Sequence, residues 1–199
     1  MSEEETLAAI GIGAAAVDGD ADTLILGEMG IGNSTVAAAL AAAFFGGKPE
    51  DWVGASTASD AGGIARKCAA VERGLALHRG LDAFDTHSRL DGREQAAICG
   101  SVLAARTFRI PVILDGFICT AAASTLHVAN RSLLDHCLMG HGSAEPGHRR
   151  PPNVLGKRPV LEPEMRLGEG TGAALALGIL SAALHCHNGM ATFVEAGIG

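Results

Sequence analysis

The sequence predicts an α/β fold, in which a parallel β-sheet carries helices on its faces. Two short apolar runs, residues 23–26 and 110–114, each end in a glycine-containing turn and then lead into a helical pattern. Strands that alternate with helices are typical of parallel sheets, because the connecting helix returns the chain to the same edge of the sheet. Hydrophobic residues make up 48% and charged residues only 19% of the 199 residues, which suits a compact fold rather than a disordered chain. We therefore expect residues 1–199 to form a single α/β domain.

Local signals predict the elements of the first half of the chain. A helix is expected over residues 2–17, because three glutamates near its start suit the positive end of the helix dipole. The first strand follows at residues 23–26, and an alanine-rich pattern predicts a second helix over residues 35–45. Two glycines and a proline then end that helix. Asp60 is a suitable N-cap for a third helix that runs to about residue 78, with apolar residues at spacings of three and four.

The second half of the chain repeats the alternation of strand and helix. Residues 80–92 are polar and are expected to be irregular, whereas residues 93–108 again have a helical pattern. The strand at 110–114 leads into a helix of small residues over 120–129, and residues 133–139 predict a third strand. A last helix over residues 171–185 is apolar on nearly all sides, so we expect it to be buried.

The turn between the first strand and the second helix is the first candidate binding site. Unpaired backbone N–H groups at a helix start favour an anion such as phosphate, and Gly30 and Gly32 would let the backbone approach it closely. Asn33 or Ser34 can cap the helix. The turn lacks both the dinucleotide fingerprint and the lysine of a P-loop, so an ordinary βα turn is an equal alternative. Glu28 does not suit a phosphate cradle and indicates a second task, such as accepting a proton.

Other polar residues follow the predicted strands at the same edge of the sheet. Ligands of open α/β sheets bind outside the carboxyl ends of the strands, where Glu28, Asp115 and the loop at 143–149 are expected to lie. Glu169 precedes the last helix. It could merely stabilise the helix dipole, but the glycines on both sides of it favour close approach by a ligand.

Composition argues against several classes of function. The net charge is −7 and no basic run exceeds two residues, which argues against nucleic acid as a partner. The longest apolar stretches, residues 36–45 and 173–184, fall short of a membrane span. Five cysteines without any C-x-x-C pattern are most simply reduced and buried. Together with an acidic N-terminus, these features predict a cytoplasmic protein.

Two hydrolase classes are also disfavoured. His136, Cys137 and His141 lie close in sequence, but neighbouring residues of a strand point to opposite faces and cannot readily share one metal ion. H-E-x-x-H is absent, so no metal site is expected. A Ser-His-Asp hydrolase would need a G-x-S-x-G elbow, which the sequence lacks.

Six segments, in order along nearly the whole chain, resemble the nicotinate-nucleotide–dimethylbenzimidazole phosphoribosyltransferase family of cobalamin assembly. They are residues 27–35 (GEMGIGNST), 65–67 (ARK), 110–117 (IPVILDGF), 143–149 (SAEPGHR), 166–172 (RLGEGTG) and 190–197 (MATFVEAG). The resemblance implies a Rossmann-like core, a homodimer and no cofactor. It also implies transfer of phosphoribose from nicotinate mononucleotide to 5,6-dimethylbenzimidazole, which yields α-ribazole 5′-phosphate and nicotinate.

Site residues are carried over by motif from this resemblance. Glu169 resembles the general base and Glu28 the second carboxylate of the pocket. The turn from Gly30 to Ser34 resembles the phosphate site together with Lys67, which spacing alone would assign to solvated surface. The expected substrate-binding residues are Gly30, Gly32, Asn33, Ser34, Lys67, Asp115, Ser143, Ala144, Glu145, Gly147, Leu167, Gly170, Thr171 and Gly172.

The chain departs from the family mainly at its start. The resemblance covers the core and C-terminal part of the family, whose N-terminal segment contributes to the benzimidazole pocket and is expected to be absent here. The stretches at residues 54–59 and 85–90 also differ from the family pattern. A fragment or truncated paralogue that binds nucleotide without turnover is therefore the alternative to an active transferase.

Overall fold

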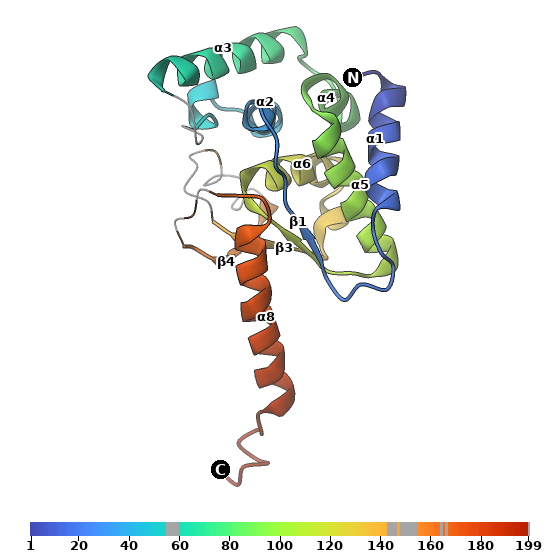
Figure 1. The fold of residues 1–199 in the computed structure, drawn as a ribbon, viewed down its shortest axis with the longest axis vertical. Helices are drawn as coiled ribbons and strands as arrows, with labels where there is room; N and C mark the ends of the chain where they lie inside the picture. Colours follow the sequence, from blue (N-terminus) through green and yellow to red (C-terminus); the bar gives the residue numbers. More distant parts are fainter. Residues whose placement is uncertain (55–59, 143–146, 148–154, 164, 166, 199) are drawn as a thin grey trace.

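A computed structural model of the chain describes residues 1–54, 60–142, 147, 155–163, 165 and 167–198. Its sheet has four parallel strands in the order β1 (Leu24–Leu26), β2 (Val112–Leu114), β3 (Cys137–His141) and β4 (Pro159–Leu161). Helices flank this sheet, so the predicted parallel α/β fold is confirmed (Figure 1). The sequence did not predict β4. It also placed the third strand too early, because the chain first makes a 3-10 turn at Arg131–Leu134.

Three helices predicted from an acidic first turn, an N-cap or periodicity form close to the expected bounds. They are α1 (Glu3–Ala15), α3 (Ala61–Leu77) and α5 (Arg93–Phe108). Ser2 and Glu5 form a reciprocal capping box at α1, and Asp60 accepts the Gly63 N–H at the start of α3.

Two further helices begin earlier than the sequence indicated. They are α2 (Asn33–Phe45) and α6 (Gly116–Ala129), and each starts directly after the turn that ends a strand. In both turns a glycine with positive φ reverses the chain, Gly32 before α2 and Gly116 at the start of α6. The turn between β1 and α2 and the turn between β2 and α6 are therefore shorter than the sequence predicted.

The central strand β2 separates the two faces of the sheet. Val112 and Leu114 pack in one buried cluster with apolar residues of α5 and α6. Ile113, which points to the opposite face, packs with Ala173 and Ala176 of α8 (Thr171–Gly189). All three residues of β2 are at most 1% exposed, as expected for a strand covered on both faces. One end of α8 is thereby fixed at the carboxyl edge of the sheet.

The prediction that residues 80–92 are irregular is wrong, because α4 (Ala83–Leu90) lies there. Asp82 caps this helix by accepting the Asp85 N–H. The polarity that suggested a loop comes partly from His87, whose buried ring lies 2.6 Å from the Asp91 carboxylate and 2.8 Å from the Thr125 hydroxyl. A polar segment can be buried here because one ring nitrogen lies within hydrogen-bond distance of Thr125 and the other within ion-pair distance of Asp91.

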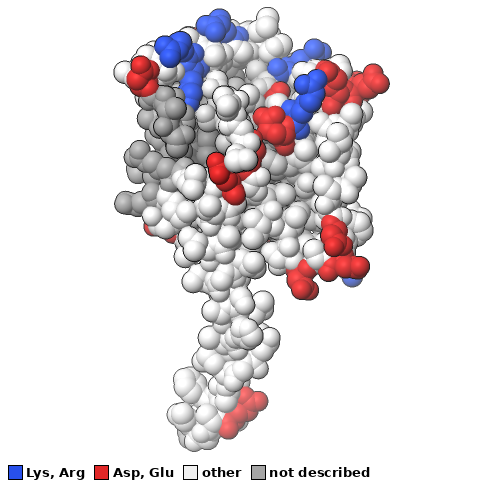
Figure 2. Space-filling model, viewed as in Figure 1, with Lys and Arg blue, Asp and Glu red and all other residues white. Residues whose placement is uncertain are grey.

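The prediction that the last helix is buried is also wrong for most of its length. Beyond Ala176 no residue of α8 is fully buried, and every described residue from 181 onward is exposed. The helix projects away from the sheet (Figure 1), and its visible surface is almost free of charged side chains (Figure 2). Its apolar composition therefore indicates a need for a packing partner, which the described residues supply only near its start. Within the described part of the chain, every helix is too short or too polar to span a bilayer.

The cysteines follow their prediction with one exception. Cys68, Cys99, Cys119 and Cys137 are buried and unbridged. Cys186 is exposed, because it lies on the projecting part of α8.

Candidate active site

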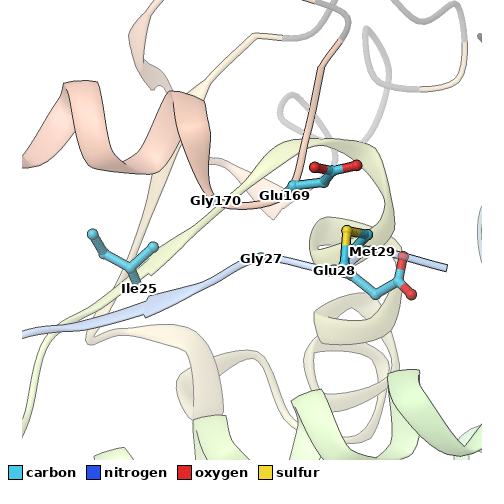
Figure 3. A pocket seen from close by; sticks show the side chains of 6 residues that line it. All are labelled: Ile25, Gly27, Glu28, Met29, Glu169 and Gly170. Atoms are coloured by element: carbon cyan, nitrogen blue, oxygen red, sulfur yellow. The ribbon is translucent and has the colours of Figure 1, made fainter.

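A cleft of about 350 Å³ opens at the carboxyl end of β1. Its lining comes from two segments far apart in sequence, the end of β1 with the turn after it and the turn before α8 (Figure 3). The lining residues are Ile25, Gly27, Glu28, Met29, Glu169 and Gly170. The two candidate catalytic carboxylates are therefore brought to one cleft, at the edge of a parallel sheet where ligands of such folds bind.

The two lining segments touch through backbone atoms. A Cβ built on Gly27 would overlap the Gly170 nitrogen and lie 2.7 Å from the Glu169 carbonyl carbon. Any side chain at position 27 would thus force the turn that carries Glu169 away from β1. Gly27 is required here for close approach, a role different from the phosphate contact proposed for the glycines after it.

Glu28 is half-buried and lines this cleft. Its carboxylate accepts a hydrogen bond from the Asn33 side-chain amide. Burial raises the pKa of Glu28, the charges of Glu94 and Glu169 add to the rise, and the Asn33 hydrogen bond opposes it. A carboxylate with a raised pKa is a better proton acceptor than an ordinary one.

The turn after Glu28 leads into α2 in a way that differs from the predicted cap. The N-cap is Gly32, with φ +94°, and no side chain caps the helix, so the predicted capping by Asn33 or Ser34 is wrong. Asn33 is instead the first residue of the helix, and its amide is directed back to Glu28. The N–H groups of the first turn are thus left without a side-chain acceptor among the described residues.

Lys67 reaches this helix start from α3. Its ammonium donates a hydrogen bond to the Ser34 hydroxyl over 3.3 Å. The side chain is half-buried rather than freely solvated, so the structure does not favour the surface assignment that spacing alone suggested. A cation, a hydroxyl and the helix N-terminus therefore meet close to Glu28, as an anion site requires.

Asp115 lies behind the turn that carries Glu169 and is 3% exposed. Its carboxylate accepts the N–H of Gly170 at 3.0 Å and the N–H of Ala173 at 2.7 Å. Burial opposes ionisation, but the nearby His141 ring and the hydrogen bonds from these two amides outweigh it and hold the pKa of Asp115 below its ordinary value.

The remaining predicted residues are distributed unevenly. Thr171 donates its hydroxyl to the carbonyls of Leu167 and Gly168, and the Leu167 side chain is 50% exposed. Gly172 packs against the His141 ring, and Gly147 packs against Trp52 and Phe117, so neither lines the cleft. The predicted residues 143–145 lie outside the described residues.

Sequence reasoning missed three residues that line the cleft, Ile25, Gly27 and Met29. Gly27 carried a usable signal, because a glycine at the end of an apolar strand often marks a close backbone approach. Glu94 was also missed, and no local pattern indicates that its charge acts on Glu28. Among the described residues, no three His, Cys, Asp or Glu side chains are grouped as metal ligands would be.

Comparison with known proteins assigns this chain to a family. The family model described as phosphoribosyltransferase matches residues 1–198. A protein of Rhodobacter capsulatus named nicotinate-nucleotide–dimethylbenzimidazole phosphoribosyltransferase is 65% identical over 198 residues, and one of the same name from Rhizobium etli is 54% identical over 200 residues. The matches cover 100% of this chain, which spans 59% of the length of each of these curated relatives.

A solved structure gives the same result. The crystal structure of CobT from Thermus thermophilus superimposes with a TM-score of 0.91 at 42% sequence identity, and the match covers 100% of this chain and 61% of that one. Sequence and fold agree over the whole of the chain, and the predicted resemblance is confirmed. The chain belongs to the phosphoribosyltransferase family that includes the nicotinate-nucleotide–dimethylbenzimidazole enzymes.

Proposed function

We propose that the chain transfers phosphoribose from nicotinate mononucleotide to 5,6-dimethylbenzimidazole, with formation of α-ribazole 5′-phosphate and nicotinate. The observation that carries the proposal is the shared cleft of Glu28 and Glu169, next to the start of α2 where Lys67 approaches Ser34. The named relatives, which are longer than this chain, supply the identities of the two substrates.

The chemistry explains why carboxylates are needed. One ring nitrogen of the benzimidazole forms a bond to C1′ of the ribose, while the bond from C1′ to the pyridinium nitrogen breaks and its electron pair returns to nicotinate. The pyridinium already carries the positive charge, so the leaving group needs no acid. The N–H proton of the acceptor passes to Glu169 as general base. Glu28 stabilises the positive charge that develops at C1′.

The phosphate of the nucleotide is proposed to bind at the start of α2. The first turn of this helix contains no acidic residue, and its N–H groups carry the positive end of the helix dipole. Lys67 and the Ser34 hydroxyl, 3.3 Å apart, supply a charge and a further donor. A Cβ on Gly32 would meet nothing within 4 Å, so the approach on that side is open, whereas a Cβ on Gly30 would overlap the Glu28 carboxylate.

An apolar acceptor ring is supported by exposed apolar side chains beside the carboxylates. Met29 is 79% exposed and Leu167, two residues before Glu169, is 50% exposed. A flat aromatic ring bound against them would cover apolar surface while its N–H faced a carboxylate.

The alternative is a chain that binds the nucleotide without turnover, and one experiment separates the two. The purified protein is mixed with nicotinate mononucleotide, with and without dimethylbenzimidazole, and both binding and nicotinate release are measured. An active transferase releases nicotinate only when the acceptor is present. Binding without acceptor-dependent release would favour the alternative.

The proposed assembly is a homodimer located in the cytoplasm. Support for the dimer comes from the exposed apolar residues of α8, among them Leu175, Ile179 and Leu184, which are 51–61% exposed. Sedimentation over a range of protein concentrations measures this oligomeric state.

Support for the cytoplasmic location comes from four buried cysteines without disulfides.

A further inference from the structure

The turn that carries Glu169 has a backbone conformation that needs support. Glu169 has φ +62°, in the left-handed region that residues with a side chain rarely adopt, and Gly170 after it has φ +86°. A non-glycine residue in this conformation is strained, so the surrounding structure must hold it in place. Side chains that hold this turn therefore control where the Glu169 carboxylate lies.

Asp115 provides that support from a different element. Gly170 is the N-cap of α8 and has no side chain of its own, so the first N–H groups of the helix need an acceptor from elsewhere. The two carboxylate oxygens of Asp115 divide this task, Oδ2 accepting from Gly170 and Oδ1 from Ala173. One side chain thus connects the end of β2 to the residue that follows Glu169.

His141 completes the arrangement from the end of β3. Its Nδ1 lies 3.4 Å from Asp115 Oδ1, and the His141 side chain is 1% exposed. A Cβ on Gly172 would lie 2.6 Å from Cε1 of this ring. Only glycine at this position therefore lets α8 approach His141 and Asp115. The ends of two strands and the start of one helix therefore meet at Asp115.

We propose that Asp115 and His141 are positioning residues, which fix the backbone of Glu169 so that its carboxylate stays directed at the cleft. The inference rests on the proposed function, because it assigns both residues to the general base of that reaction. It differs from the sequence-based expectation for Asp115, which placed this carboxylate on the substrate. A buried carboxylate whose oxygens already accept two backbone N–H groups acts on Glu169 instead.

The test begins with Asp115→Asn, which keeps the size of the side chain but replaces one acceptor oxygen by a donor. We expect kcat to fall about 10- to 100-fold while KM for nicotinate mononucleotide changes by less than about threefold, because the base is misplaced and the nucleotide site is intact. His141→Gln, which keeps a donor, should retain more of kcat than His141→Leu. The control is Ser101→Ala, which removes a buried hydrogen bond to the Gly13 carbonyl and should leave kcat unchanged.

Two further measurements distinguish a positioning role of Asp115 from a general loss of stability of the fold. In a Glu169→Gln background, Asp115→Asn should cause little additional loss of kcat, because both changes act on the same group. Amide hydrogen exchange at Gly170 and Ala173 should become at least about tenfold faster in Asp115→Asn than in the parent protein. Additive losses of kcat, or unchanged exchange at both amides, would overturn the positioning role. Absence of turnover in the parent protein would defeat the proposed function alone, because the exchange measurement still decides the inference.

Discussion

Gly27 and Gly170 are in direct backbone contact, although 143 positions separate them in the sequence. The contact joins the end of β1 to the start of α8 and places Glu28 and Glu169, the neighbours of these glycines, at the same cleft (Figure 3). The relative position of the two carboxylates therefore depends on a site where no side chain fits.

Gly27→Ala tests this dependence. The added methyl group would overlap the Gly170 nitrogen, so we expect a loss of about 1–3 kcal/mol in the free energy of unfolding and a lower kcat. Urea denaturation and nicotinate release measure the two effects. Gly11→Ala is the control, because a Cβ at this exposed helix position meets nothing within 4 Å and should leave kcat unchanged. Equal behaviour of the two variants would contradict the role of the contact.

The pKa of Glu28 should respond in opposite directions to two neighbours. Glu94→Gln removes a negative charge and is expected to lower this pKa, whereas Asn33→Ala removes a hydrogen bond to the carboxylate and is expected to raise it. If ionised Glu28 supports turnover, activity is lost as the pH falls through its pKa. The acidic limb of the pH–rate profile then moves to lower pH in Glu94→Gln and to higher pH in Asn33→Ala.

Carboxyl resonances followed by NMR give the same pKa without relying on turnover. Glu72→Gln, a change at an exposed residue of α3, is the control and should leave the Glu28 titration in place. Shifts of the same sign in Glu94→Gln and Asn33→Ala would rule out this description of the site.

Asp115 should also contribute to stability in a pH-dependent way. Its pKa in the folded protein lies below the ordinary value of 3.8, so its ionised form stabilises the fold. That contribution is fully present above pH 3.8 and is lost as the pH falls through the lower folded value. The stability difference between the parent protein and Asp115→Asn, measured by urea denaturation, should be constant near neutral pH and should shrink below 3.8. A difference that grows towards acid would contradict the lowered pKa.

The buried pair of His87 and Asp91 should matter more for stability than the surface pair of Arg93 and Glu5. The first pair lies 2.6 Å apart with side chains 2% and 0% exposed, and the second is equally close but 69% and 47% exposed. Asp91→Ala leaves a buried ring without its carboxylate and is expected to cost about 3–5 kcal/mol in unfolding free energy. Arg93→Ala should cost far less, because water screens an exposed pair. Similar denaturation midpoints for the two variants would contradict this ranking.

Leu184→Glu tests the proposed dimer. This residue is 61% exposed on the projecting part of α8, and a charge there should weaken an apolar interface and shift sedimentation towards the monomer. Glu162→Gln, an exposed change outside α8, is the control. A parent protein that sediments as a monomer at all concentrations would exclude the dimer.

The sequence predicted those parts of the fold that local chemistry determines. Asp60 marked the start of α3 correctly, because capping is a contact between residues three apart. The acidic first turn likewise marked the start of α1. Prediction from the sequence failed where a polar residue finds a distant partner, as His87 does in Thr125, since the polarity of α4 then looks like a loop. It failed again at α8, because an apolar pattern shows that a surface should be covered but not what covers it.

In the candidate site, too, features set by local sequence were predicted and features set by distant contacts were not. Glu28 and Glu169 were predicted from their glycine-rich turns and from the resemblance, and both line the cleft. The support of Glu169 by Asp115 was not predicted, because it depends on how the end of β2 meets the start of α8. Asn33 or Ser34 was expected to cap α2, but Gly32 is the N-cap and the Asn33 amide contacts Glu28, five residues away.

The central claim is that Glu169 is the general base of a phosphoribosyl transfer, and Glu169→Gln tests it most directly. The variant keeps the size of the side chain and removes its ability to accept a proton. Acceptor-dependent nicotinate release and calorimetric binding of nicotinate mononucleotide are measured side by side. We expect release to fall at least about 100-fold while the nucleotide Kd stays within about threefold of the parent value. Release at the parent rate in Glu169→Gln would contradict the assignment.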